Sequence, residues 1–111
     1  MLTIGSATRV FLAVRPVDLR SSFNRLHGFV SEVLRQDPRS GHWFVFTNKM
    51  RSRIKVYVFD GNGTWVLTKR LEAGRFGWPT SENASLRLRQ EEFAALVNGL
   101  EVVAKSNWYR E

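Results

Sequence analysis

The sequence predicts a small α+β domain with one long helix packed on a face of a small antiparallel sheet and a short C-terminal helix. Three observations predict it. Apolar residues recur at helical steps after Asp18, three β-rich runs fill the middle of the chain, and helical spacing returns after Gln90. With 111 residues the chain has the size of one hydrophobic core. We expect a single compact domain over residues 1–104 and a polar C-terminal tail over 105–111.

The first two elements are a strand and the long helix. Thr8 to Val14 is rich in β-forming residues and ends at Pro16, where proline blocks a strand. Asp18 then stands at a helix N-cap position. The apolar stripe behind it is Leu19, Phe23, Leu26, Val30, Val33 and Leu34. The helix is expected to end before Asp37 and Pro38.

The centre of the sheet comes from three strand candidates, Trp43 to Thr47, Ile54 to Asp60 and Thr64 to Arg70. A tight turn at Gly61-Asn62 joins the last two and sets Val58 opposite Trp65. Alternation then predicts two faces. One is a core face of Phe44, Phe46, Ile54, Val56, Val58, Trp65 and Leu67. The other face, which either the helix or a ligand covers, carries Trp43, Val45, Lys55, Tyr57, Val66 and Thr68.

The last third of the chain predicts three further elements. A loop spans Gly74 to Pro79, and a short strand follows over Ser85 to Leu88. The spacing of apolar residues predicts a helix over Gln90 to Val97, with Gly99 as its stop.

The residues that could carry chemistry have simpler structural roles. The chain has no cysteine, which removes disulfides and thiolate metal sites. Asp18, Asp37 and Asp60 each fit a cap or a turn better than a shared metal site. His27 and His42 fit separate packing or surface roles better than a zinc pair. We therefore expect no enzymatic activity, no metal, no cofactor and no small-molecule substrate.

The positive charge is concentrated in the middle of the chain. Lysine and arginine number 17 against 10 acids, for a net charge of +7. Between His42 and Pro79 only Asp60 and Glu72 oppose seven cations, namely Lys49, Arg51, Arg53, Lys55, Lys69, Arg70 and Arg75. This charge favours a polyanion partner, with phosphate contacts rather than base readout. A merely solvated basic surface is the alternative. Trp43, Tyr57 and Trp78 are the aromatics expected to stack on bases or to contact a partner.

The order of short motifs resembles a known family. The chain is similar to the TnpB accessory protein of the IS 66 insertion-sequence family in Asp18-Leu19-Arg20, Asp37-Pro38-Arg39-Ser40-Gly41, Phe44-Val45-Phe46, Arg53-Ile54-Lys55, Asp60-Gly61-Asn62-Gly63, Lys69-Arg70-Leu71-Glu72, Gly74-Arg75-Phe76 and Trp78-Pro79. The resemblance implies an accessory factor of DNA transposition, encoded beside a larger transposase that cuts the strands. Two departures are Arg89-Gln90, where relatives have a natural N-cap, and a less basic segment over residues 47–50.

Two functions follow from the resemblance and the charge. The first is DNA binding, nonspecific in sequence, through the seven cations. The alternative is a protein-interaction module that docks the transposase through Trp43, Tyr57, Val66 and the tail, without contacting DNA. No N-terminal signal pattern and no membrane-length apolar stretch occur, so we expect a soluble bacterial protein of the cytoplasm, nucleoid-associated if it binds DNA, with no membrane partner.

Overall fold

A computed structural model describes residues 4–20 and 23–99, and it contains a five-stranded mixed sheet in the order β4-β3-β2-β1-β5. Strand β1 pairs in parallel with β2, and the other three pairings are antiparallel. The strands are β1 (Val10–Ala13), β2 (Trp43–Thr47), β3 (Arg53–Phe59), β4 (Thr64–Arg70) and β5 (Ser85–Leu88). None of the described helices is long and apolar enough to cross a membrane.

The prediction of an antiparallel sheet with one long helix is wrong. The helical segment between β1 and β2 is short: the six-residue helix α1 (Phe23–Gly28) runs into the five-residue π-helical turn η1 (Phe29–Val33). The chain between β1 and β2, which includes this helical segment, returns to the starting end of the sheet. Such a crossover connection is what the parallel pairing of β1 with β2 requires. The second helix, α2 (Gln90–Val97), is eight residues long and has the predicted bounds.

Two local interactions shorten the first helix. The carboxylate of Asp18 accepts hydrogen bonds from the backbone N–H of Arg20 at 3.0 Å and from its guanidinium at 2.9 and 3.0 Å. Asp18 therefore closes its own turn instead of capping a helix. At the other end, Arg35 has a φ of 56°, and the N–H of Gln36 bonds to the carbonyl of Val30 at 3.0 Å, which ends the helix.

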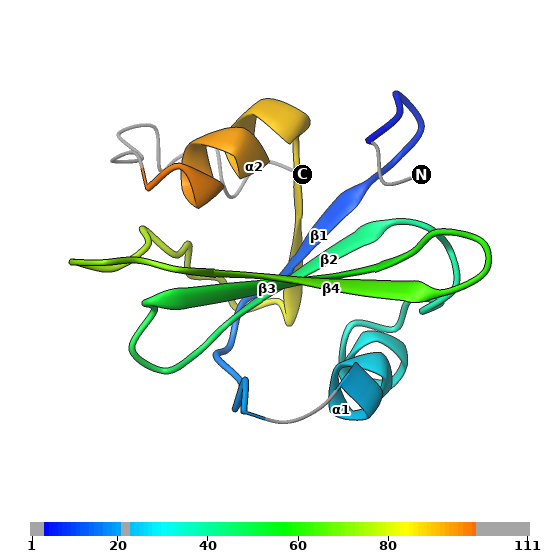
Figure 1. Cartoon of the computed structure of the whole chain (residues 1–111), viewed down its shortest axis with the longest axis horizontal. Coiled ribbons are helices and arrows are strands. Elements are labelled where there is room, and N and C mark those ends of the chain that lie inside the picture. The colour runs from blue at the N-terminus through cyan, green and yellow to red at the C-terminus, as the bar shows by residue number, and fades with distance from the viewer. Residues whose placement is uncertain (1–3, 21–22, 100–111) are drawn as a thin grey trace.

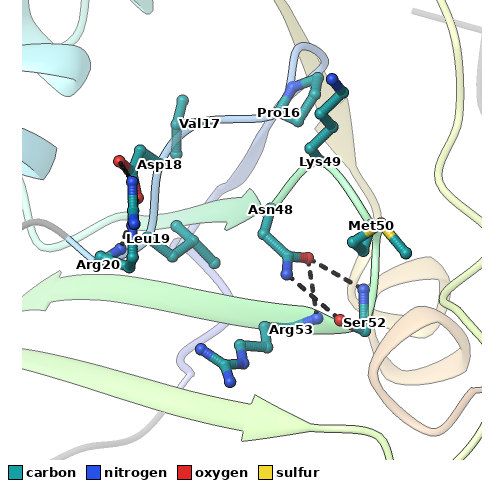
Figure 2. A pocket seen from close by; sticks show the side chains of 10 residues that line it. All are labelled: Pro16, Val17, Asp18, Leu19, Arg20, Asn48, Lys49, Met50, Ser52 and Arg53. Atoms are coloured by element: carbon teal, nitrogen blue, oxygen red, sulfur yellow. Dashed lines mark hydrogen bonds and ion pairs between the residues drawn. The ribbon is translucent and has the colours of Figure 1, made fainter.

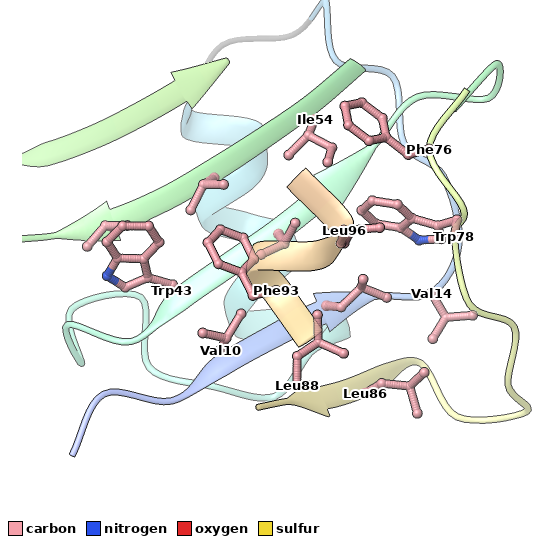
Figure 3. Close-up of a cluster of buried hydrophobic side chains, with 14 residues drawn as sticks. Val10, Val14, Trp43, Ile54, Phe76, Trp78, Leu86, Leu88, Phe93 and Leu96 are labelled. Carbon is pink, nitrogen blue, oxygen red and sulfur yellow. The ribbon is translucent and has the colours of Figure 1, made fainter. Parts of the chain in front are cut away.

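Helices cover both faces of the sheet, which runs across the view of Figure 1 with α2 above it and α1 below it. The cluster on the α2 side contains Val10, Leu12, Trp43, Val45, Ile54, Val56, Val58, Phe76, Trp78, Leu86, Leu88, Phe93 and Leu96, most of which Figure 3 labels. The cluster on the α1 side contains Phe11, Leu19, Leu26, Val30, Leu34, Phe44, Phe46 and Tyr57. The sheet is therefore the middle layer of three.

The predicted pairing of β3 with β4 is confirmed, since Val58 lies opposite Trp65. The predicted grouping of β2 with β3 is wrong by one residue, because Phe44 lies opposite Tyr57 and both belong to the α1 side. The β2–β3 loop sets this register: the side-chain oxygen of Asn48 accepts the N–H groups of Ser52 and Arg53 at 3.0 and 3.1 Å. Because both faces are buried, the apolar pattern alone could not choose between the two registers.

Trp65 was expected in the core, and that expectation is wrong. Its side chain is 46% exposed on the edge strand β4, and its indole N–H donates to Asp60 at 2.6 Å. The turn itself closes as predicted, with the N–H of Asp60 bonded to the carbonyl of Gly63 at 3.0 Å. Gly61 has a φ of 112°, which side chains rarely adopt, so glycine is required there.

Helix α2 begins cleanly although Arg89 occupies its N-cap position. The carboxylate of Glu92 accepts the N–H of Arg89 at 2.8 Å, and the two side chains form an ion pair at 3.4 Å. The helix ends at Val97, and Gly99 follows as the predicted glycine stop with a φ of 68°. The expected tail over 105–111 lies outside the described residues.

Candidate nucleic-acid interface

The open end of the β3–β4 hairpin gathers three cations on the α1 side of the sheet. Arg53 lies directly opposite Arg70, and Lys55 lies opposite Thr68 one pair further in. The three share a face because residues two apart on a strand point the same way. Helix α1 covers the other end of the hairpin, where the ring of His27 contacts the hydroxyl of Tyr57 at 2.9 Å. Arg53 and Arg70 remain exposed.

A groove of about 740 Å³ lies beside these cations (Figure 2). Residues 16–20 form one wall, and residues 48–50, 52 and 53 form the other. The N–H of Val17 bonds to the carbonyl of Thr47 at 2.9 Å and ties the two walls together. Lys49 is exposed on the loop wall. We call Lys49, Arg53, Lys55 and Arg70 the hairpin cluster.

One carboxylate lies in the groove, and it is already paired. Hydrogen bonds from Arg20 lower the pKa of Asp18 from 3.8 to about 2, so this carboxylate is ionised at neutral pH. The ion pair between Asp18 and Arg20, 2.9 Å long, cancels both charges locally. The groove therefore owes its positive charge to Lys49 and Arg53.

The other three predicted cations lie elsewhere. Lys69 is on the opposite face of β4, and its ammonium donates to the carbonyl of Val97 at 2.6 Å, at the end of α2. Arg51 is in the β2–β3 loop, and its carbonyl accepts the N–H of Phe76 at 2.7 Å. This bond places the loop of Arg51 beside the segment that carries the exposed Arg75, whereas Lys69 is separated from the hairpin cluster by the sheet.

The three predicted aromatics are core residues. Trp43 is 9% exposed and packs edge-on against Phe93 of α2, with the ring centroids 5.7 Å apart. Tyr57 is 2% exposed beneath α1, on the opposite face from Trp43. Trp78 is 7% exposed and donates its indole N–H to the carbonyl of Ala13 at 3.0 Å. The single face that was predicted to carry both Trp43 and Tyr57 is thus two faces, each covered by a helix.

The hairpin cluster has no acidic partner among residues 4–20 and 23–99, where the ion pairs are Arg20 with Asp18 and Arg89 with Glu92. Like charges directly opposite each other on a sheet are destabilising. The pair of Arg53 and Arg70 therefore costs stability unless an anion lies against it.

A second group of cations was missed in the sequence. Arg9, Arg87 and Arg89 line a depression of about 620 Å³ at the β5 edge of the sheet. Arg87 in the last strand and Arg89 just after it were a signal in the sequence, but the neighbouring acidic residues offset their charge. Within the described part of the chain, no three His, Asp or Glu side chains are placed to hold a metal ion.

Comparison with known proteins identifies the family. A family model described as IS66 Orf2 like protein matches residues 8–107. Two similar proteins from Sinorhizobium fredii (strain NGR234) are the uncharacterized protein y4hO, 37% identical, and the uncharacterized protein y4jC, 39% identical. Both alignments cover 91% of this chain, and they cover 88% and 86% of the two relatives. No solved structure matches the chain. On the extent of these matches, the chain belongs to the family of IS66 Orf2-like proteins.

Proposed function

We propose that this protein is a non-catalytic accessory factor of DNA transposition that holds DNA through the hairpin cluster. Membership of the IS66 Orf2-like family supports the link to transposition. The observation that carries the DNA contact is the exposed pair Arg53 and Arg70, placed opposite each other with no described acidic partner. A DNA backbone supplies the negative charge that this pair lacks.

The geometry of the hairpin cluster suits phosphates rather than bases. Residues opposite each other on neighbouring strands have Cβ atoms about 4.5–5.5 Å apart, and phosphates of one DNA strand recur every ~3.4 Å along the duplex axis. Long arginine side chains from Arg53 and Arg70 therefore reach neighbouring phosphates, and Lys55 and Lys49 extend the contact. Phosphate contacts position a protein without reading sequence. The interface is therefore expected to accept any duplex.

Docking of the transposase without DNA contact has less support. That function depended on an uncovered aromatic face and on the tail. Helices α1 and α2 cover the rings of Tyr57 and Trp43, and the tail lies outside the described residues. In the hairpin cluster, in contrast, Lys49, Arg53 and Arg70 are exposed, and none of its four cations forms an ion pair within the described residues. DNA holding is therefore the function that the site supports best.

Fluorescence anisotropy with an element-end duplex and a scrambled duplex tests the proposal. Both duplexes should bind, and the affinity should fall steeply between about 50 and 200 mM salt. Each lost phosphate contact lowers the slope of log affinity against log salt by about 0.9, so the Arg53→Gln/Arg70→Gln variant should lower it by ~1.8.

Lys69→Gln is the matched control, because it removes the same charge from the neighbouring residue on the opposite face. It should leave the slope unchanged. Salt-insensitive binding, or equal losses from Arg70→Gln and Lys69→Gln, would contradict the proposal. Transposase association that survives nuclease treatment, with no DNA binding at low salt, would support the docking module instead.

A further inference from the structure

The second group of cations lies at the opposite edge of the sheet from the hairpin cluster. Arg87 is on the edge strand β5, opposite Phe11 of β1, and the exposed Arg9 precedes β1. Both line the depression of about 620 Å³, together with Ser6 and Thr8. We call Arg9 and Arg87 the β5-edge pair.

Both side chains of this pair are available to an anion. The ion pairs within the described ranges include neither Arg9 nor Arg87, whereas the neighbouring Arg89 is bound to Glu92. Glu91 is the carboxylate in the lining of the depression, so the two free cations exceed it. Arg9 is held in place by its backbone, whose N–H donates to the ring of His42 at 3.0 Å, and its side chain is not used in this contact.

Burial and the charges of Arg9 and Arg87 lower the pKa of His42. The imidazole between the two arginines therefore stays neutral at physiological pH and adds no charge. Its neutral nitrogen accepts the hydrogen bond that fixes Arg9.

Distance and shape separate the two groups of cations. Across the sheet, Arg87 on β5 is four strand positions from Arg70 on β4, about 19 Å, and Arg9 before β1 is two positions from Arg53 on β3, about 10 Å, at ~4.8 Å per strand. Arg9 is level with the start of β2 and Arg53 with its end, some 20 Å along the strands at ~3.3 Å per residue. Helix α1 packs on the strands between these corners and is about 10 Å thick. A straight duplex lying against the hairpin cluster therefore cannot also reach the β5-edge pair.

We propose that the β5-edge pair contacts a second DNA duplex, so that one molecule of this protein bridges two duplexes. This inference rests on the proposed function of the hairpin cluster. The partner is a second phosphate backbone, because cations and hydroxyl groups line the depression and its apolar side chain, Leu88, is buried and offers little surface to a protein partner. Bridging is the property that a single basic surface does not provide.

A bridging assay tests the inference with the full chain. One duplex is immobilised, the protein is added, and retention of a labelled second duplex is measured together with direct binding of a single duplex. We expect the wild-type protein to retain the second duplex. Arg9→Gln/Arg87→Gln should lower this retention at least about tenfold, while single-duplex affinity stays within about threefold.

Arg15→Gln/Arg35→Gln is the control with the same change in net charge, since both arginines are exposed and lie outside the two groups. It should bridge as the wild type does. Bridging that persists in Arg9→Gln/Arg87→Gln, as a dimer of hairpin clusters would produce, overturns the inference. Binding of one duplex without retention of a second also overturns it, and leaves the proposed function standing. No binding of any duplex refutes both.

Discussion

Replacing Arg70 with glutamine is expected to stabilise the fold while it weakens DNA binding. Arg70 lies directly opposite Arg53 on the neighbouring strand, and both side chains are exposed. Cross-strand pairs contribute about 0.2–1 kcal/mol, and like charges act against stability. A repulsion of ~0.5 kcal/mol corresponds to a rise in melting temperature of roughly 2–4 °C for a domain of this size. Arg70→Glu turns the repulsion into attraction and should gain about twice as much free energy.

Urea denaturation of a double-mutant cycle measures this repulsion. The four proteins are the wild type, Arg53→Gln, Arg70→Gln and the double variant, at low and at high salt. The coupling free energy should be repulsive at low salt and shrink as salt screens the charges. Lys69→Gln should instead lower the free energy of unfolding by about 1 kcal/mol, because it loses the hydrogen bond to Val97. An absent or attractive coupling, or destabilisation by Arg70→Gln, refutes the reasoning.

Two further predictions concern contacts around the site. Tyr57→Phe removes the hydrogen bond to His27 and should lower the free energy of unfolding, measured by urea denaturation, by about 0.5–1.5 kcal/mol. The DNA affinity measured by fluorescence anisotropy should not change. Loss of DNA binding in a folded variant would contradict the core role of this ring. The folded-state pKa of Asp18 lies below its ordinary value of 3.8, so its stabilising contribution is complete above about pH 4 and is lost as the pH falls towards 2. An NMR titration of the Asp18 carboxyl should give a midpoint near 2, and a midpoint near 3.8 would show that Arg20 does not hold this carboxylate in solution.

Local sequence signals predicted most helices and strands well, because these elements depend mainly on residues that are close in the chain. The bounds of β2, β4, β5 and α2 were predicted from alternation, helical spacing and turn residues. The hairpin register followed from the Asp60–Gly63 turn, because a short turn fixes which residues face each other. The first helix was predicted too long, since Leu19 belongs to the apolar stripe but is buried from a turn that Asp18 closes.

The sequence predicted which cations belong to the candidate site, but only part of their arrangement in space. The seven cations were identified from charge, yet the fold puts Lys69 behind the sheet and draws Arg53, Lys55 and Arg70 onto one face. The β5-edge pair was missed because Arg9 and Arg87 are far apart in the chain and meet only through the pairing of β1 with β5.

The sequence by itself determined the number of strands in the hairpin region, the turn that joins them, the excess of positive charge and the family. These depend on residue identity and on spacings of a few residues. Only the tertiary structure decided the parallel pairing of β1 with β2, the register of β2 against β3, and the covering of both faces. With two buried faces, the apolar pattern is satisfied by either register, and packing over long sequence separations selects one. That same packing buries the aromatics and leaves Arg53 and Arg70 exposed on the surface.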